Sequence, residues 1–407
     1  MLIAPIDATN MAHPGDTTGT GSVTLSATVT DRLEDVEAIW RTLAGQAIES
    51  PGQSYDFIRT WVRQRAIAPD DQRYVVGRVD GQPVALWPLH RRRAFGLPVF
   101  TWFPGANVGC NAPVVDLVWL AALGAQGRQQ LWAAMAGALS GADLIYLRAI
   151  PVSVGGYDGL FDALGQTLSV DVLYRSQYSS WAQCDKLQRS RSRRKHDRQQ
   201  GDRLQALGQV SFEEVRNGVP SAEIIDTMFR QRSARFKAMG IRDVFVRDRL
   251  IGFYHDAMSV GSGIDVRLHV LRLDGEIIAV RYNIVHGDRM FCLISSMSDD
   301  PAIQAGSPGK QCLLRVMQTV FDDGISVFDM GTGFTDEKRH WCNVRIEVQH
   351  HYIGLTAKGA FVAKAHRALQ TVRARIKANP SVKHALRGVR QRYEHYTGRQ
   401  KPAVPGE

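Results

Sequence analysis

Strand-like and helix-like patterns of apolar residues follow one another in an order that this chain repeats. Residues 23–30 alternate between apolar and polar positions like a strand, and residues 36–43 place apolar side chains on one helix face. Further along, two strand patterns flank an Asp-Gly pair, which is typical of a tight hairpin turn. The second half repeats this order and the hairpin, so the pattern predicts a duplicated unit. The segments that align without a gap are 73–86 (RYVVGRVDGQPVAL) and 267–280 (RLHVLRLDGEIIAV).

Each half reads as a strand, two helices, three strands, a helix and a closing strand. This order predicts an α/β (α+β) fold built on a mixed sheet with helices on both faces. Pro88, within a strand pattern of the first half, indicates an edge strand because proline has no N–H for a sheet ladder. The predicted division is a lead over 1–22, a first domain over 23–183, a basic linker helix over 184–206, a second domain over 207–356 and a basic helical tail over 357–407.

Six short motifs occur along the chain in a fixed order. They are SPGQSYDFIRTW (50–61), the first hairpin with its PLHRRR extension, the basic segment before the second half, DGEIIAVRYNI (274–284), SPGKQCLL (307–314) and FDMGTGFTDEKRHW (328–341). With these motifs, residues 23–356 resemble the CelD-like, or BioF2-like, acetyltransferase family found beside bacterial polysaccharide genes. The resemblance implies two tandem Gcn5-related N-acetyltransferase folds, similar to those of the FemAB-type peptidyl transferases. It also implies an acyl-coenzyme A donor, above all acetyl-coenzyme A, and an acceptor amine or hydroxyl on a small molecule or glycan precursor.

One predicted site lies at residues 304–311 (QAGSPGKQ), which precede a helix. Backbone amides at a helix N-terminus can hold phosphate oxygens, and the resembling fold holds the pyrophosphate of coenzyme A in this loop. Ser307, Gly309 and Lys310 are therefore predicted to bind the cofactor. The alternative is that Pro308 starts the helix and Ser307 caps it, which requires no ligand.

A second predicted site follows the strand pattern that ends in FDMGTG. Asp329 lies near the carboxyl end of this strand, where ligand clefts open in α/β sheets. Gly331 and Gly333 allow a backbone to approach closely, and Lys338 matches the loop lysine that contacts the anion in the resembling family. The hypothesis is that Asp329 and Lys338 are catalytic and that the two glycines bind the cofactor. The alternative is a turn-capping aspartate and a solvated lysine.

Acid–base groups and acceptor contacts complete the candidate residues. Amide acyl transfer needs a base for the attacking amine, and Tyr282 and His286 offer catalytic groups on one face of a strand. The first half lacks this pattern, so we expect the second half to be active and the first to shape the acceptor cleft. Gln53 and Tyr55 are predicted to contact a sugar or amine, whereas Trp61 is assigned to the core.

The net charge of +10 is concentrated in two segments. Residues 186–203 contain eight Lys or Arg, and residues 358–401 contain twelve with a single acid. Arg194 and Arg198 share one side of the first segment and are predicted to contact a phosphorylated acceptor or a tRNA end; the alternative is a solvated linker. The tail is predicted to touch an anionic membrane surface or to pack on its own domain. No other nucleic acid is expected as a partner.

Composition and the lack of targeting motifs indicate the cellular location. Apolar residues make up 44% of the chain, yet no stretch reaches the ~18 apolar residues of a membrane span. Residues 1–22 read as a lead without a targeting signal. The five scattered cysteines form no CxxC pair, so neither a disulfide framework nor a metal site is expected. The predicted setting is the cytoplasm, with a peripheral place at the inner face of the membrane as an option.

The leading hypothesis is an acyltransferase in which the acceptor attacks the donor directly within a ternary complex. The FemAB resemblance and the basic linker also fit an aminoacyl-tRNA-dependent peptidyl transferase. A polysaccharide-assembly adaptor without catalytic activity would keep the fold and use only the basic surface. The sequence contains no nucleophile elbow, Walker loop or dinucleotide loop, so a covalent acyl-enzyme is not expected.

Overall fold

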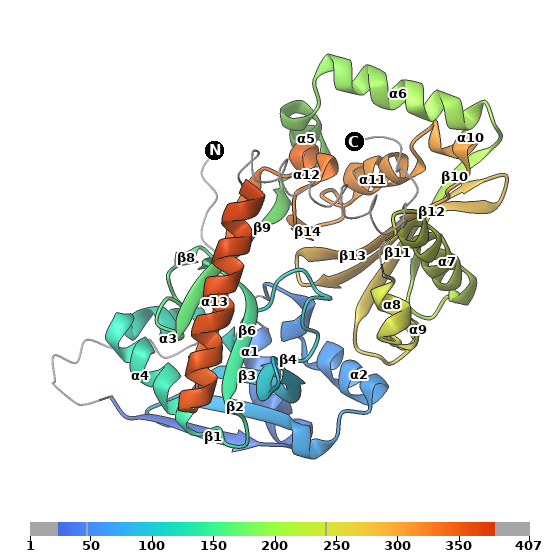
Figure 1. Cartoon of the computed structure of the whole chain (residues 1–407). Coiled ribbons are helices and arrows are strands. Elements are labelled where there is room, and N and C mark those ends of the chain that lie inside the picture. Colours follow the sequence, from blue (N-terminus) through green and yellow to red (C-terminus); the bar gives the residue numbers. More distant parts are fainter. Residues whose placement is uncertain (1–22, 46–47, 241, 379–407) are drawn as a thin grey trace.

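The computed structural model describes residues 23–378, apart from 46–47 and 241. The predicted lead over 1–22 and the end of the predicted tail lie outside these residues. Within them, thirteen strands join into one sheet that mixes parallel and antiparallel pairs. Helices cover both faces of this sheet, so the predicted α/β architecture is confirmed (Figure 1).

The first half supplies one end of the sheet. Its elements are β1 (Leu25–Thr30), α1 (Glu37–Ala44), α2 (Tyr55–Arg65), β2 (Gln72–Val79), β3 (Gln82–Ala94), β4 (Leu97–Trp102), β5 (Val114–Val115), α3 (Leu117–Ala122), α4 (Gly124–Gly137), β6 (Leu144–Pro151), β7 (Ser153–Val154), β8 (Tyr157–Asp158) and β9 (Gln166–Gln177). β1, β2, β3 and β4 pair antiparallel in sequence order, and β7 and β8 form a separate ribbon. β4 and β6 run parallel but pair only up to Phe100 and Ile145.

The second half supplies the other end. Its elements are α5 (Trp181–Gln188), α6 (Arg191–Gln205), β10 (Val210–Arg216), α7 (Ala222–Ala238), α8 (Val244–Arg247), α9 (Ile251–Met258), β11 (Asp265–Leu273), β12 (Glu276–His286), β13 (Arg289–Met297), α10 (Pro301–Gln304), α11 (Pro308–Thr319), β14 (Val327–Thr332), α12 (Asp336–Trp341), β15 (Val344–Gly354) and α13 (Ala357–Ala378). β10 to β13 pair antiparallel, and β13 and β14 run parallel. The order of elements therefore matches that of the first half.

The two halves exchange their closing strands. β9, the last strand of the first half, pairs with β14 of the second, and β15, the last strand of the second, pairs with β6 of the first. β9 and β15 also pair with each other at the middle of the sheet. The resulting order is β1-β2-β3-β4-β6-β15-β9-β14-β13-β12-β11-β10. The sheet is therefore continuous across the predicted domain boundary.

One apolar core spans both halves. Buried side chains of α1 and α2 form a single cluster with those of α7 and α9. Phe57 and Trp61 of α2 contact Phe253 of α9, with ring centres 4.9 and 5.1 Å apart. Trp61 is 4% exposed, which confirms its assignment to the core. Since aromatic side chains bury large apolar areas, these contacts fasten one half to the other.

The tail helix α13 packs on β15 and also on the first half (Figure 1). Its Ala363 is buried in a cluster with Leu97 and Leu144 of the first half. Because β15 pairs with β6, the helix that follows β15 packs against the first half. The sequence predicted packing on its own domain, which describes only the contact with β15.

Two strand expectations need correction. Pro88 does not mark an edge, because β3 pairs with β2 on one side and with β5 and β4 on the other. It lies between the β5 pairing, which ends at Leu86, and the β4 pairing, which begins at Leu89, so no ladder N–H is required there. β9 is absent from the sequence prediction, although its twelve residues hold the middle of the sheet.

Candidate active site

A cavity of about 430 Å³ opens where β13 and β14 separate. The two strands pair only as far as Phe291 and Asp329, and the sheet then leaves a gap. Residues of α7, α8 and α12 line its walls, and residues 106–109 of the first half also line it. The cavity thus lies at the carboxyl end of β14, where the sequence predicted a ligand cleft. We call it the second-half cavity.

The side chain of Lys338 lines the second-half cavity. Its residue is only 9% exposed, so the alternative of a solvated lysine does not hold. The ammonium Nζ donates to the carbonyl oxygens of Gly331, at 3.2 Å, and Thr332, and lies 5.7 Å from the ring centre of Tyr174. Burial lowers the pKa of Lys338 below its ordinary value. A fixed cation at a cavity wall is suited to hold negative charge that develops during a reaction.

Asp329 belongs to a buried ionic cluster at the edge of this cavity. One carboxylate oxygen accepts from Arg175 Nε at 2.7 Å, and the other accepts from the Gly331 N–H at 2.8 Å. Arg175 also contacts the carboxylate of Glu49 at 2.6 Å, and Arg289 contacts the same carboxylate at 3.0 Å. Burial raises the pKa of Glu49, but the two arginines outweigh it and hold that pKa below its ordinary value. Asp329 therefore caps a turn, as the alternative expected, while it also lines the cavity.

Gly331 and Gly109 allow a first-half loop to lie against the cavity. Their φ angles are +75° and +77°, which L side chains rarely adopt. A Cβ on Gly109 would lie 3.1 Å from Gly331 Cα, so the two backbones approach closely only without side chains. The close approach expected at Gly331 is thus made by the protein's own loop. Gly333 lies beyond the cavity lining, with φ of +85°.

Three further charged residues of the cavity were not found from the sequence. Arg281 on β12 is 3% exposed and donates to the Glu337 carboxylate at 3.1 Å and to the Gly309 carbonyl at 3.1 Å. Arg232 on α7 donates to the Ser295 carbonyl at 2.9 Å. Within the described residues, no carboxylate forms an ion pair with Arg232, and burial lowers its pKa. Arg232 and Lys338 therefore give the cavity two cations that form no ion pair with a carboxylate among the described residues.

An arginine inside an otherwise apolar strand was the signal for Arg281. Alternation places Arg281 and Tyr282 on opposite faces of β12. Tyr282 lies in the core, where its hydroxyl donates to the Tyr254 carbonyl at 3.0 Å and burial raises its pKa. His286 contacts the Ala44 carbonyl at 3.2 Å. The structure does not bring Tyr282 and His286 to Asp329 and Lys338, because the opposite face of β12 lines the cavity.

The first turn of α11 lies next to the second-half cavity but does not line it. The contact between Arg281 and the Gly309 carbonyl links them. Ser307 has a left-handed φ of +52° and makes no side-chain cap; its hydroxyl accepts from Gln200 at 2.8 Å. The predicted side-chain cap is therefore not formed by Ser307. Lys310 is half-buried, and the cofactor contacts of Ser307, Gly309 and Lys310 stay predictions.

The predicted acceptor residues Gln53 and Tyr55 are occupied within the first half. The Gln53 side chain accepts from the Glu49 N–H at 2.6 Å and donates to the Pro113 carbonyl at 2.7 Å. Tyr55 is 3% exposed and packs edge-on against Trp40, with ring centres 5.7 Å apart. Neither lines the second-half cavity. Gln53 thus holds the backbone of Glu49, whose carboxylate belongs to the ionic cluster, and the acceptor contacts of Gln53 and Tyr55 stay predictions.

Arg194 and Arg198 lie on α6, away from the second-half cavity lining. They border a shallow hollow of about 380 Å³ between α6 and α11. Arg194 pairs with Asp185 at 2.8 Å, and both arginines are exposed. The buried residue Asp197 also lines this hollow, and its carboxylate binds Arg189 and Arg193 at 2.9 and 3.0 Å. Contacts of Arg194 and Arg198 with a phosphorylated acceptor or a tRNA end stay predictions.

Two features of the described residues concern metal sites and membrane-spanning helices. Among the residues that the structure describes, no group of His, Cys, Asp and Glu is arranged to hold a metal ion. In the same residues, no helix combines the length and the apolar content that crossing a bilayer requires.

Comparison with known proteins places this cavity in a recognised domain. The family model described as an acetyltransferase (GNAT) domain matches residues 191–339, which include α7, β12, β13, β14 and the first part of α12. No curated protein matches the chain in sequence. The match confirms an acyltransferase, with the Gcn5-related acetyltransferase domain recognised over residues 191–339. Membership of the CelD-like family stays a prediction.

Solved structures resemble the chain over both halves. The crystal structure of FemX is 11% identical, with a TM-score of 0.50 over 78% of this chain and 95% of its own. The C-terminal domain (DUF2156) of a putative lysylphosphatidylglycerol synthetase from Agrobacterium fabrum is 13% identical, with a TM-score of 0.49 over 82% and 95%. A tandem GNAT protein from the clavulanic acid biosynthesis pathway is 10% identical, with a TM-score of 0.40 over 82% and 98%. At these identities the FemX likeness shows a shared fold and nothing finer.

Proposed function

We propose that this acyltransferase moves an acyl group from acyl-coenzyme A to an amine or hydroxyl of a small molecule or glycan precursor, with the reaction in the second-half cavity. One observation carries the proposal. A cavity with a buried lysine opens between separated strands within the segment that matches the acetyltransferase domain. The CelD-like relationship and the polysaccharide setting belong to the same proposal.

In the proposed reaction, the acceptor nitrogen or oxygen attacks the thioester carbonyl carbon. The C–S bond breaks, coenzyme A leaves as the thiol, and the proton lost by the acceptor balances the thiolate. Lys338, held by the Gly331 and Thr332 carbonyls, would stabilise the negative charge on the carbonyl oxygen. Asp329 would fix the loop through the Gly331 N–H rather than take the proton, since both of its oxygens are already bound.

Arg232 and the first turn of α11 are the groups that suit the donor. Arg232 has a guanidinium without a carboxylate partner in the described residues and lines the second-half cavity. The backbone of Gly309 lies against Arg281 at the neighbouring wall. These positions fit an anionic donor such as coenzyme A.

Calorimetric titration of the full chain with acetyl-coenzyme A tests the proposal. We expect binding in the micromolar range, weakened at least tenfold by Lys338→Ala and unchanged by Lys237→Ala at the exposed end of α7. Absence of binding, or equal affinity of the two variants, contradicts it.

The second candidate function is an aminoacyl-tRNA-dependent peptidyl transfer in the same cavity. The exposed arginines of α6 favour it, because they offer a cationic surface for a polyanion. Protection by charged tRNA without any binding of acetyl-coenzyme A would establish this function instead. If neither binds, and polyanion binding falls steeply with salt, the non-catalytic adaptor is supported.

We also propose that α13 holds the enzyme at an anionic membrane surface on the cytoplasmic side. Phe361, Leu369 and Val372 of α13 are 72%, 47% and 50% exposed and lie on one helix side, near the exposed Lys364 and Arg375. Cosedimentation with vesicles rich in phosphatidylglycerol should fall severalfold in Phe361→Ser. Equal sedimentation with neutral vesicles argues against the electrostatic part of this proposal.

A further inference from the structure

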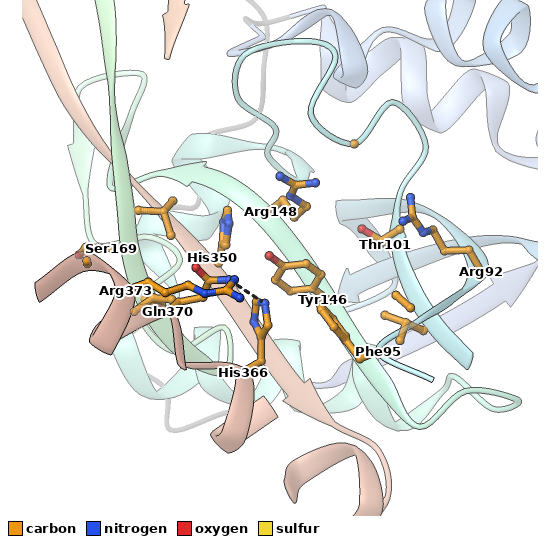
Figure 2. Close-up of a pocket in the computed structure, with 16 residues that line it drawn as sticks. Arg92, Phe95, Thr101, Tyr146, Arg148, Ser169, His350, His366, Gln370 and Arg373 are labelled. Atoms are coloured by element: carbon orange, nitrogen blue, oxygen red, sulfur yellow. Dashed lines mark hydrogen bonds between the residues drawn. The ribbon is translucent and has the colours of Figure 1, made fainter. Parts of the chain in front are cut away.

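A larger cavity, of about 730 Å³, opens in the first half. It lies where β4 and β6 separate after Phe100 and Ile145, the place that corresponds to the second-half cavity. Helix α13 forms one wall (Figure 2). Its volume falls within the ~300–1,000 Å³ typical of small-molecule sites. We call it the first-half cavity.

Three arginines from separate elements line the first-half cavity. They are Arg92 on β3, Arg148 on β6 and Arg373 on α13 (Figure 2). Among the described residues, none of the three forms an ion pair with a carboxylate, and no Asp or Glu lines the cavity. The Nε of Arg148 is buried without a hydrogen-bond partner. Cations that gather without counter-charges create a strongly positive potential, which an anionic ligand would relieve.

Neutral hydrogen-bonding groups surround these cations. The Nδ1 atom of His350 accepts from the Ala149 N–H at 3.0 Å, so the neutral ring carries its proton on Nε2 and remains a donor. Burial, and next to it the charge of Arg148, lowers the pKa of His350 to about 3. His366 of α13 contacts the Tyr352 hydroxyl at 3.0 Å. The lining thus combines fixed cations with neutral donors, a set that suits phosphate oxygens.

A smaller hollow of about 250 Å³ lies between the two cavities. It shares Arg148 and His350 with the first-half cavity, and it shares Gly109 and Thr332 with the second-half cavity. This hollow therefore lies along the direction from the arginines past Gly109 toward the second-half cavity, which Lys338 lines.

We propose that the first-half cavity binds the phosphate-bearing end of the acceptor through Arg92, Arg148 and Arg373, while the other end reaches the second-half cavity. The acceptor role rests on the proposed function, whereas binding of a phosphorylated molecule does not. Guanidinium groups match phosphate oxygens in geometry and stay charged at every physiological pH, so a phosphate or diphosphate suits the site better than a single carboxylate.

Titration of the full chain with inorganic pyrophosphate tests the site directly. We expect one site whose Kd rises about tenfold or more in Arg373→Gln, because a charge-assisted contact is lost. Arg375→Gln is the matched control, since Arg375 is exposed on the same helix and does not line the cavity. No binding, or an equal Kd in the two variants, overturns the proposal.

Repeating the titration with saturating acetyl-coenzyme A tests the acceptor role. An unchanged pyrophosphate affinity supports two separate sites. Competition, together with weaker acetyl-coenzyme A binding by Arg373→Gln, assigns the first-half cavity to the donor and overturns the acceptor role. If acetyl-coenzyme A does not bind at all, the proposed function fails, and the Arg373→Gln result still decides whether the first-half cavity binds phosphate.

Discussion

The first-half and second-half cavities occupy matching places in the sheet and differ in charge. Both open where two parallel strands of their half separate. In the first-half cavity Arg148 has no carboxylate partner among the described residues, whereas in the second-half cavity Arg281 is paired with Glu337 at 3.1 Å. Duplication thus copies the place where strands diverge, and the side chains that point into the gap set the chemistry. The comparison explains why a half without catalytic motifs still contains a built cavity.

The largest expected effect tests whether the halves depend on each other. Arg175→Met removes the cation that joins Glu49 of the first half to Asp329 of the second. Two buried carboxylates would lose their shared partner, so we expect a loss of about 3–5 kcal/mol in the free energy of unfolding. Urea denaturation measures it.

The control for Arg175→Met is Arg345→Met on the neighbouring strand. Arg345 is exposed and lies 6.0 Å from the Tyr174 ring centre, so its loss should cost less than about 1 kcal/mol. Similar losses in the two variants would mean that the buried cluster does not join the halves energetically.

Lys338→Ala should separate the two cavities in function. We expect the rate of acyl transfer, measured by chromatography as coenzyme A released, to fall about 10²–10³-fold, as for the loss of one oxyanion-stabilising group. Pyrophosphate binding in the first-half cavity should not change, since Lys338 does not line it. A loss of both activities at once would show that the cavities are not independent.

Gly109→Ala should disturb the contact between the first-half loop and the second-half cavity. The left-handed φ of +77° and the approach of 3.1 Å to Gly331 Cα both oppose a Cβ. We expect a loss of about 2–3 kcal/mol in the free energy of unfolding, together with slower acyl transfer.

Gly96→Ala is the matched control for Gly109→Ala. It has the same φ of +77° and no atom within 4 Å of the added Cβ. It should therefore cost only about 1–2 kcal/mol, from backbone strain alone. If the two variants lose equal stability, the close approach contributes nothing.

The last prediction concerns pH and belongs to the first-half cavity. In the folded protein burial keeps the pKa of His350 at about 3, against 6.5 for the free group. Between these values the unfolded chain binds the extra proton, so this histidine makes stability fall as pH drops from about 6.5 toward 3. His350→Asn should reduce that slope in urea denaturation at a series of pH values. His196→Asn, on the exposed face of α6, should leave it unchanged, and an equal slope in all three proteins would refute the assignment.

Local pattern accounts for much of the fold and for part of the candidate site. The Asp-Gly hairpins and the alternation around them predicted β2, β3, β11 and β12. The strand that carries Asp329 and the loop that carries Lys338 were also predicted from short-range sequence. An apolar strand pattern indicates the first, and Gly331 and Gly333 indicate the second. Both residues line the cavity.

The missed residues depend on contacts between distant segments. Asp329 is bound by Arg175, 154 residues earlier, so its ion pair cannot be predicted from the local sequence, whereas its turn-capping contact with Gly331 can. Arg281 and Tyr282 are neighbours, and a sequence alone does not say which face of β12 borders a cavity. Arg148 and Arg373 meet only because β15 carries α13 across to the first half. The first-half cavity was therefore outside the reach of pattern analysis.

The exchange of β9 and β15 also constrains how such a protein can change over evolution. If one half were replaced by that of a relative, its closing strand would have to pair with the retained half. The closing strand of the retained half would also have to pair with the replacement. Recombination at the midpoint of the gene would thus need two new strand pairings to succeed together. We therefore expect the tandem to be inherited as a single unit and its halves to diverge by point substitution within a shared sheet.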